Sequence, residues 1–128
     1  MKIYYTDRYT IDLCRANPEA IFVFGDNLIH AGTAGQAIIR REPNAFGIPT
    51  KRYPATTDHS YFSDAKCELE HVKRALRELY DRLRKGGVDL FWPSKGIGTG
   101  LAKMPSKSPI IYTEMCDILL KHFGVKNG

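Results

Sequence analysis

The chain has 128 residues, of which 43% are hydrophobic and 26% charged, and its formal net charge is +5. A chain of this length can bury a core unaided, so we expect residues 1–128 to form a single domain. Charged residues are spread over the first 20 positions, and no apolar run approaches the roughly 20 residues that span a bilayer. These features predict a cytoplasmic protein with no membrane partner. The basic excess suits a ligand or partner that carries phosphate.

Three cysteines, Cys14, Cys67 and Cys116, lie far apart in the chain. They form no CxxC pair and no zinc spacing, which predicts reduced thiols and no metal site. Neither a Ser-His-Asp pattern nor a pair of carboxylates stands out, and nothing in the sequence calls for a cofactor.

The sequence pattern predicts strands that alternate with helices. The expected elements, in chain order, are a strand at 2–5, a short helix through about 17 capped by Thr10, a strand at 21–24, a helix at about 34–41, an extended segment at 45–49, a loop at 53–62, a helix at about 64–85 capped by Ser63, a strand at 88–92 and a helix from 108 to 123. Pro49 places its segment at a sheet edge or a strand end. The alternation predicts an α/β domain with helices on both faces of the sheet.

Two loops that contain glycine each follow an apolar strand, one at residues 25–36 and the other at 94–100. Glycine, small and hydroxyl residues at the end of a strand expose backbone N–H groups, which can bind phosphate. In α/β sheets, ligands bind at the carboxyl ends of the strands. The two loops therefore predict a ligand with more than one phosphate, or with a phosphate beside a sugar.

In the first loop, Asp26 and Asn27 come directly off the strand. Their carboxylate and amide groups suit ribose hydroxyls or an adenine amine, and Gly32 and Gly35 allow a ligand to approach the backbone closely. A plain turn from strand to helix, with Asn27 as its cap, explains the same residues. His30 lies in this loop as well, although most loop histidines have no chemical role.

In the second loop, Gly96, Gly98 and Gly100 alternate around Thr99. The pattern lacks the third glycine of the dinucleotide fingerprint and the GK[ST] of a P-loop. Three alternating glycines cost conformational entropy that a bare turn does not need, so a loop that wraps phosphate is favoured. Lys51, at the end of the extended segment, can bind phosphate or act as a nucleophile, or it can be a solvated surface lysine.

Together these segments resemble a macro domain over about residues 21–123. The resemblance rests on the triplet 25–27, the small-residue loop 31–37, and Phe91-Trp92-Pro93 leading into the run 96–101. It is closest to the branch that contains the terminal ADP-ribose protein glycohydrolase and the bacterial antitoxins that remove ADP-ribose from DNA. The resemblance implies a three-layer α/β/α domain with a mostly parallel or mixed sheet. The ligand-binding residues expected from the loops and the resemblance are Asp26, Asn27, Gly32, Thr33, Gly35, Gln36, Gly96, Ile97, Gly98, Thr99 and Gly100.

The resemblance further implies that the loop 27–36 holds the distal ribose of ADP-ribose and that the loop 96–100 wraps the diphosphate. Lys51 matches a catalytic lysine of that branch, and a water near Asn27 is the other route to hydrolysis. The acidic residue that the branch has after the second loop is absent from residues 101–103. Asp7 is the candidate for the contact with adenine.

Three functions follow. The first is an ADP-ribose-binding domain that hydrolyses ADP-ribosyl groups from protein or nucleic acid. The second is a module that binds ADP-ribose or a related nucleotide without converting it, which the absent carboxylate favours. The third is a basic nucleic-acid-binding protein, whose affinity would fall steeply with salt.

Overall fold

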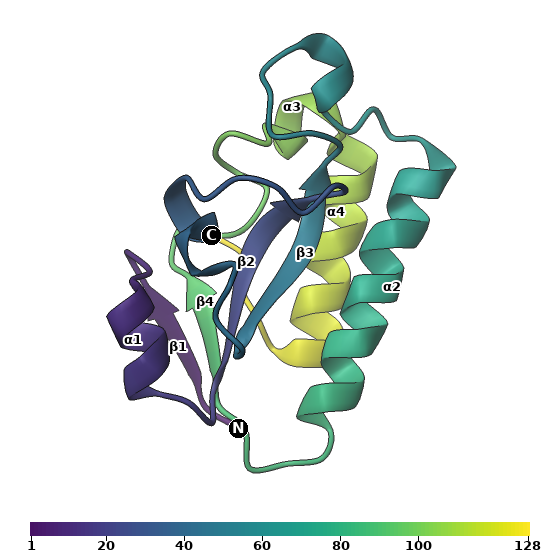
Figure 1. The fold of residues 1–128 in the computed structure, drawn as a ribbon. Helices are drawn as coiled ribbons and strands as arrows, with labels where there is room; N and C mark the ends of the chain where they lie inside the picture. Colours follow the sequence, from purple (N-terminus) through teal and green to yellow (C-terminus); the bar gives the residue numbers. More distant parts are fainter.

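A computed structural model covers residues 1–128 and describes all of them. Its elements, in chain order, are β1 (Ile3–Thr6), α1 (Ile11–Ala16), β2 (Ile21–Asn27), the 3₁₀ helix η1 (Gly35–Ile39), β3 (Ala45–Lys51), the 3₁₀ turn η2 (Asp58–Ser60), α2 (Lys66–Leu83), β4 (Leu90–Pro93), α3 (Met104–Lys107), α4 (Pro109–Ile118) and the π-helical turn η3 (Leu119–Phe123) (Figure 1). No helix combines the length and the apolar character needed to cross a membrane.

The four strands form one sheet in the order β1-β4-β2-β3, and each neighbouring pair is parallel. This arrangement confirms the predicted α/β class. The central strands β2 and β4 are apolar and largely buried, as strands covered on both faces must be. Pro49 lies in β3, the edge strand, where its missing N–H interrupts no ladder between two neighbours.

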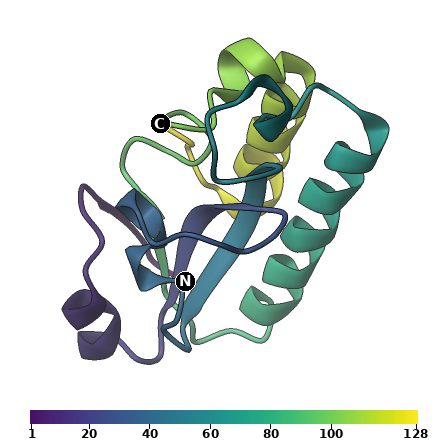
Figure 2. The same ribbon diagram turned by 45° about the horizontal axis from the view of Figure 1, so that its top comes forward.

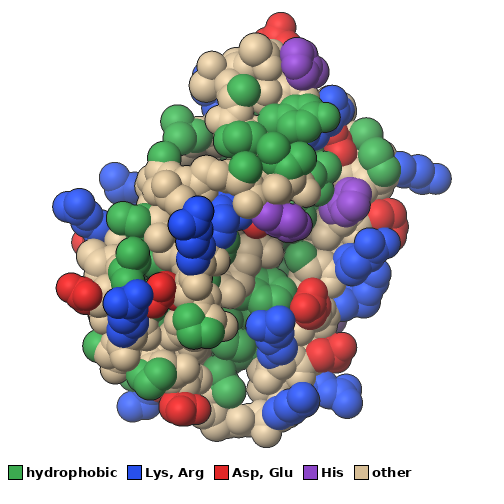
Figure 3. Space-filling model, in the orientation of Figure 1, with side chains coloured by type: hydrophobic (Ala, Val, Ile, Leu, Met, Phe, Trp, Pro, Cys, Tyr) green, Lys and Arg blue, Asp and Glu red, His purple; other side chains and the backbone are tan.

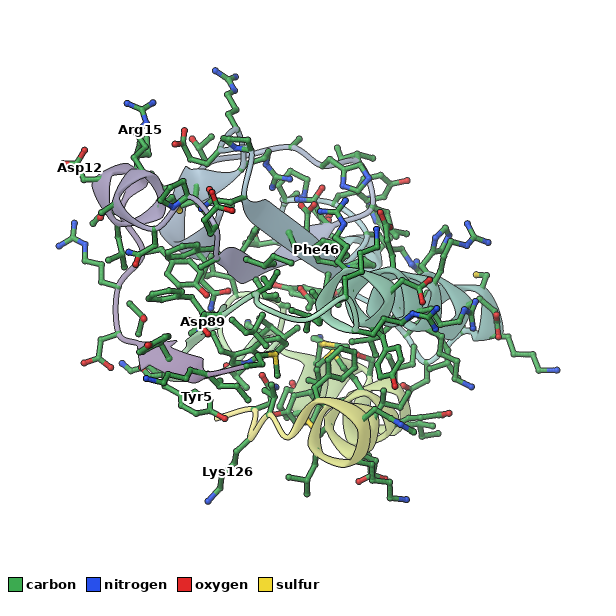
Figure 4. All side chains as sticks on the ribbon, turned by 90° about the horizontal axis from the view of Figure 1, so that it is seen from below. Tyr5, Asp12, Arg15, Phe46, Asp89 and Lys126 are labelled. Carbon is green, nitrogen blue, oxygen red and sulfur yellow. The ribbon has the colours of Figure 1, made fainter.

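Helices lie on both faces of the sheet, so the domain has three layers (Figure 1). On one face α2 and α4 pack in a cluster of 17 buried residues that includes Phe46 and Trp92. On the other face α1 and η1 pack in a cluster of eight that includes Phe22. Viewed from below, Phe46 lies on the inner side of the fold, whereas Asp12 and Arg15 of α1 point outward (Figure 4).

The helix ends follow local chemistry in most places. The Thr10 hydroxyl accepts from the backbone N–H of Leu13, as predicted for the cap of α1. Gly124 ends the last helix with φ +68°, in the left-handed region where glycine is favoured. The helix predicted at 34–41 forms only the short 3₁₀ helix η1. The short helix α3 was not predicted from the sequence.

The predicted cap of α2 is wrong. Ser63 lies before the helix, and its hydroxyl accepts from Arg52 instead. The N-cap is Ala65, whose backbone N–H donates to the Glu68 carboxylate at 3.0 Å. Glu68 is buried and also forms an ion pair with Arg52, which helps to hold the carboxylate at the N-terminus of the helix.

Candidate functional site

The loops that follow β2, β3 and β4 gather at the carboxyl end of the sheet (Figure 2). A pocket of about 300 Å³ opens among them. The connection from β2 to β3 runs through η1 on one face, and that from β3 to β4 runs through α2 on the other. Parallel sheets form their binding crevices where successive connections leave on opposite faces. A larger hollow of about 730 Å³ lies along α4 and shares no lining residue with this pocket.

The pocket brings together most of the residues that the sequence singled out. Those that line it are Asp26, Asn27, Gly32, Gly35, Gln36, Lys51, Gly98 and Gly100. Asn27 and Lys51 are register partners across β2 and β3, so the two predicted catalytic residues lie side by side. Four predicted ligand-binding residues do not line the pocket, and these are Thr33, Gly96, Ile97 and Thr99.

Two glycines of the second loop have a structural role that needs no ligand. Gly96 has φ +84°, and a Cβ there would lie 2.8 Å from the Asn127 Oδ1. Gly98 has φ +77°, and a Cβ there would overlap the thioether of Met104. Gly100 has neither constraint and borders open space in the pocket wall. The alternation of glycines is therefore explained largely by packing.

The C-terminal tail holds the second loop in place. The Asn127 Oδ1 accepts from the Trp92 indole at 2.9 Å and from the Ile97 backbone N–H at 2.8 Å, and its Nδ2 donates to the Ile97 carbonyl. Beside it, the backbone N–H of Lys126 donates to the Tyr5 hydroxyl, and Figure 4 shows these two residues together. The loop is thus fixed between β4 and the tail.

Asp26 organises the first loop through its buried carboxylate. One oxygen accepts from Arg40 Nη1 at 2.5 Å and from the Asn27 N–H at 2.7 Å, and the other lies 2.8 Å from the His30 Nδ1. The carboxylate lies across Gly47, where a Cβ would be 2.6 Å from it. Its oxygens are occupied within the protein, so Asp26 shapes the pocket wall.

Arg40 is a pocket residue that the sequence analysis did not select. It comes from the end of η1, and besides Asp26 it donates to the carbonyls of Ala31 and Gly32. These bonds hold the first loop in its open turn. The 14 residues that separate Arg40 from Asp26 match no motif, so only the fold reveals the pair.

Two amide side chains fix the loops relative to each other. The Asn27 amide closes the turn by bonding to the backbone of Ala31, as its interpretation as a turn cap predicts. Gln36 accepts from the Gly25 N–H at 2.9 Å and donates to the Gly96 carbonyl at 3.0 Å. Gln36 therefore joins the first loop to the second.

Lys51 is not the solvated surface lysine that remained an alternative from the sequence. Lys51 is only 7% exposed. Its Nζ donates to the Ala55 carbonyl at 2.7 Å and lies 4.8 Å from the centre of the Tyr61 ring. No carboxylate forms an ion pair with it. Burial, and secondarily the charge of Lys103, lowers the pKa of the Lys51 ammonium. The pocket therefore contains a buried cation without a counter-ion.

Asp7, the candidate for an adenine contact, lies just after β1. Its carboxylate accepts from the Ser94 hydroxyl at 2.5 Å, and it does not line the pocket. It links the loops that follow β1 and β4.

Fold and site together define an α/β domain with a cleft at the carboxyl end of a parallel sheet. The chain belongs to a family of unknown function, DUF7831, whose profile matches residues 4–118. The match begins within β1, covers the other three strands and ends at the last residue of α4. No curated protein and no solved structure matches the chain.

Proposed function

We propose that this chain binds a phosphate-bearing nucleotide in the pocket at the carboxyl end of its sheet, and that ADP-ribose is the representative ligand. The observation that carries the proposal is Lys51, a buried ammonium in the pocket wall with a carbonyl but no carboxylate beside it. Holding a charge out of water is unfavourable unless an opposite charge compensates it. A ligand phosphate would supply that charge.

The pocket wall supports this proposal. Its volume of about 300 Å³ lies at the lower end of the range for ligand sites, so one part of ADP-ribose would enter and the rest would lie over the rim. Gly35 and Gly100 both face open space, so their backbones can be approached closely. Gln36 keeps the two loops at a fixed separation.

Binding without turnover is the activity that the site favours. Asp26 is the only carboxylate in the pocket wall, and it is already engaged with Arg40 and His30. Hydrolysis of ADP-ribosyl groups on protein or nucleic acid, the further activity implied by the resemblance to macro domains, would depend on Lys51. A lowered pKa makes its neutral amine more accessible, as a nucleophile or a base requires.

Calorimetric titration with ADP-ribose, NAD and ATP tests the proposal. We expect roughly micromolar affinity for ADP-ribose, lost in Lys51→Met and kept in Lys121→Met, which removes an exposed lysine outside the pocket. Gly98 is a poor probe because any side chain there would overlap Met104. If none of the three nucleotides binds, the proposal is wrong. Incubation with ADP-ribosylated peptide separates a binder from a hydrolase.

A further inference from the structure

Three lysines surround one buried tyrosine next to the pocket. The Nζ atoms of Lys51, Lys107 and Lys103 lie 4.8, 5.3 and 5.7 Å from the centre of the Tyr61 ring. They come from the end of β3, from α3 and from the residue before α3. The tertiary structure alone brings these segments together, since more than 40 residues separate Tyr61 from Lys103 in the sequence.

The positive charge of this lysine cluster is not balanced within the protein. None of the six ion pairs of the chain includes Lys51, Lys103 or Lys107. Each contact with the ring contributes only about 0.5–2 kcal/mol, and the like charges repel one another. The effect of Lys103 on the Lys51 pKa reflects this repulsion. A group of cations without anions is the kind of surface that attracts a multiply charged anion.

The lysine cluster begins where the pocket ends. Lys51 belongs to both, and the pocket wall includes Leu101 and Ala102, which come directly before Lys103. The side chains of Lys103 and Lys107 are exposed, whereas Lys51 is buried. An anion that reaches the outer lysines therefore lies at the surface, one step outside the pocket. Along α2, by contrast, Lys and Arg are interspersed with Asp and Glu (Figure 3).

We propose that Lys103 and Lys107, with Lys51 and the Tyr61 ring, form a second anion subsite that takes a phosphate group carried by the pocket's ligand outside the pocket. The proposal rests on the proposed function and specifies its ligand as one with phosphates both inside the pocket and beyond the rim. That outer phosphate belongs either to a small organic polyphosphate or to the backbone of a nucleic acid that bears the bound nucleotide. The shared chemistry is a phosphate recognised by ammonium groups.

The test compares two variants with the same change in charge. The first replaces Lys103 and Lys107 by glutamine, and the control replaces Lys66 and Lys121, two exposed lysines that neither line the pocket nor contact Tyr61. Each protein is titrated with inorganic phosphate, tripolyphosphate, ADP-ribose and a ten-residue oligothymidylate with a 5′-phosphate. All four replaced side chains are exposed, so the variants should fold, and circular dichroism confirms this.

We expect the first variant to bind tripolyphosphate at least about fivefold more weakly than the wild type, while the control binds as the wild type does. Binding of the oligonucleotide that exceeds that of tripolyphosphate and falls in the same variant would assign the outer phosphate to a nucleic acid. Oligonucleotide binding that is weak, or that is unchanged in the first variant, would assign the outer phosphate to a small polyphosphate.

Equal affinity of the first variant and the wild type for tripolyphosphate would overturn the subsite, and so would an equal loss in the control, which would indicate a general effect of charge. Tripolyphosphate has no nucleoside, so this outcome is separate from the proposed function. Binding of tripolyphosphate that depends on Lys103 and Lys107, without binding of ADP-ribose, would support the subsite and refute the proposed nucleotide binding. Tight binding of ADP-ribose without binding of tripolyphosphate would support the proposed nucleotide binding and refute the subsite.

Discussion

Replacing Lys51 by methionine should stabilise the free protein while it removes ligand binding. Methionine has a similar length and no charge, so it fills the space between β3 and the Tyr61 ring without leaving an ammonium out of water. Groups that bind a ligand are often kept at the expense of stability. If Lys51 binds the ligand and does not stabilise the fold, its replacement should raise the free energy of unfolding and remove binding.

The magnitude follows from the contacts of the ammonium. Its bond to the Ala55 carbonyl contributes about 1.5–3 kcal/mol as a charged hydrogen bond. Ala55 is exposed, however, so water replaces most of that bond in the variant. The ring contact adds about 0.5–2 kcal/mol, whereas withdrawing the ammonium partly from water, in the wall of an open pocket, is unfavourable by a somewhat larger amount. We expect a net gain of about 1 kcal/mol in the free energy of unfolding, which is about 4 °C in Tm for a chain of this size.

The pH dependence has a definite sign. The pKa of Lys51 is lowered from its ordinary 10.5 in the folded protein and is ordinary in the unfolded chain. Between the two values the unfolded chain binds more protons, so the wild type gains stability as the pH rises through this window below 10.5. The methionine variant lacks this gain. Its advantage should be largest near neutral pH and should shrink as the pH approaches 10.5.

Thermal and urea unfolding followed by circular dichroism at several pH values measures both effects. Lys121→Met is the matched control, because it removes an exposed lysine and should shift the free energy of unfolding by less than about 0.5 kcal/mol. A methionine variant that is less stable than the wild type by about 1 kcal/mol or more would show that the ammonium stabilises the fold. A difference that stays constant with pH would refute the argument from the lowered pKa.

Three further substitutions, two of them with a matched control variant, test the site's framework by urea denaturation. Gly98→Ala should lower the free energy of unfolding by about 2 kcal/mol or more, since its φ is +77° and its Cβ would overlap a buried thioether, whereas Gly100→Ala should change it by less than about 1 kcal/mol. Glu68→Gln removes the charge of a buried carboxylate that pairs with the partly exposed Arg52, and it should lower the free energy of unfolding by about 2 kcal/mol, against less than about 0.5 kcal/mol for the exposed Glu78→Gln. Asn127→Ala should cost about 2 kcal/mol and shift the emission of the chain's single tryptophan, whose indole loses its acceptor. Equal effects within either pair of variants, or unchanged emission, would contradict these contacts.

Much of the fold was predictable because its signals are local. The apolar run at 21–24 predicts a buried strand, and Thr10 and Gly124 mark helix ends through their own backbone chemistry. Pro49 lacks an N–H, which predicted a sheet edge or a strand end, and β3 is the edge strand. The start of α2 was missed because its N-cap is Ala65, whose side chain has no hydrogen-bond acceptor and so gives no capping signal. The Ala65 N–H is bonded instead by Glu68, and Arg52 from another segment pairs with that carboxylate.

The sequence by itself determined that two glycine-bearing loops and Lys51 would meet. They follow strands of one α/β sheet, and the carboxyl ends of parallel strands share an edge. The tertiary structure decided what these residues do there. It pairs Asp26 with Arg40, buries Lys51 without a counter-ion and packs Gly98 against Met104. Burial and charge pairing depend on which distant segments pack together, and a single sequence does not record that.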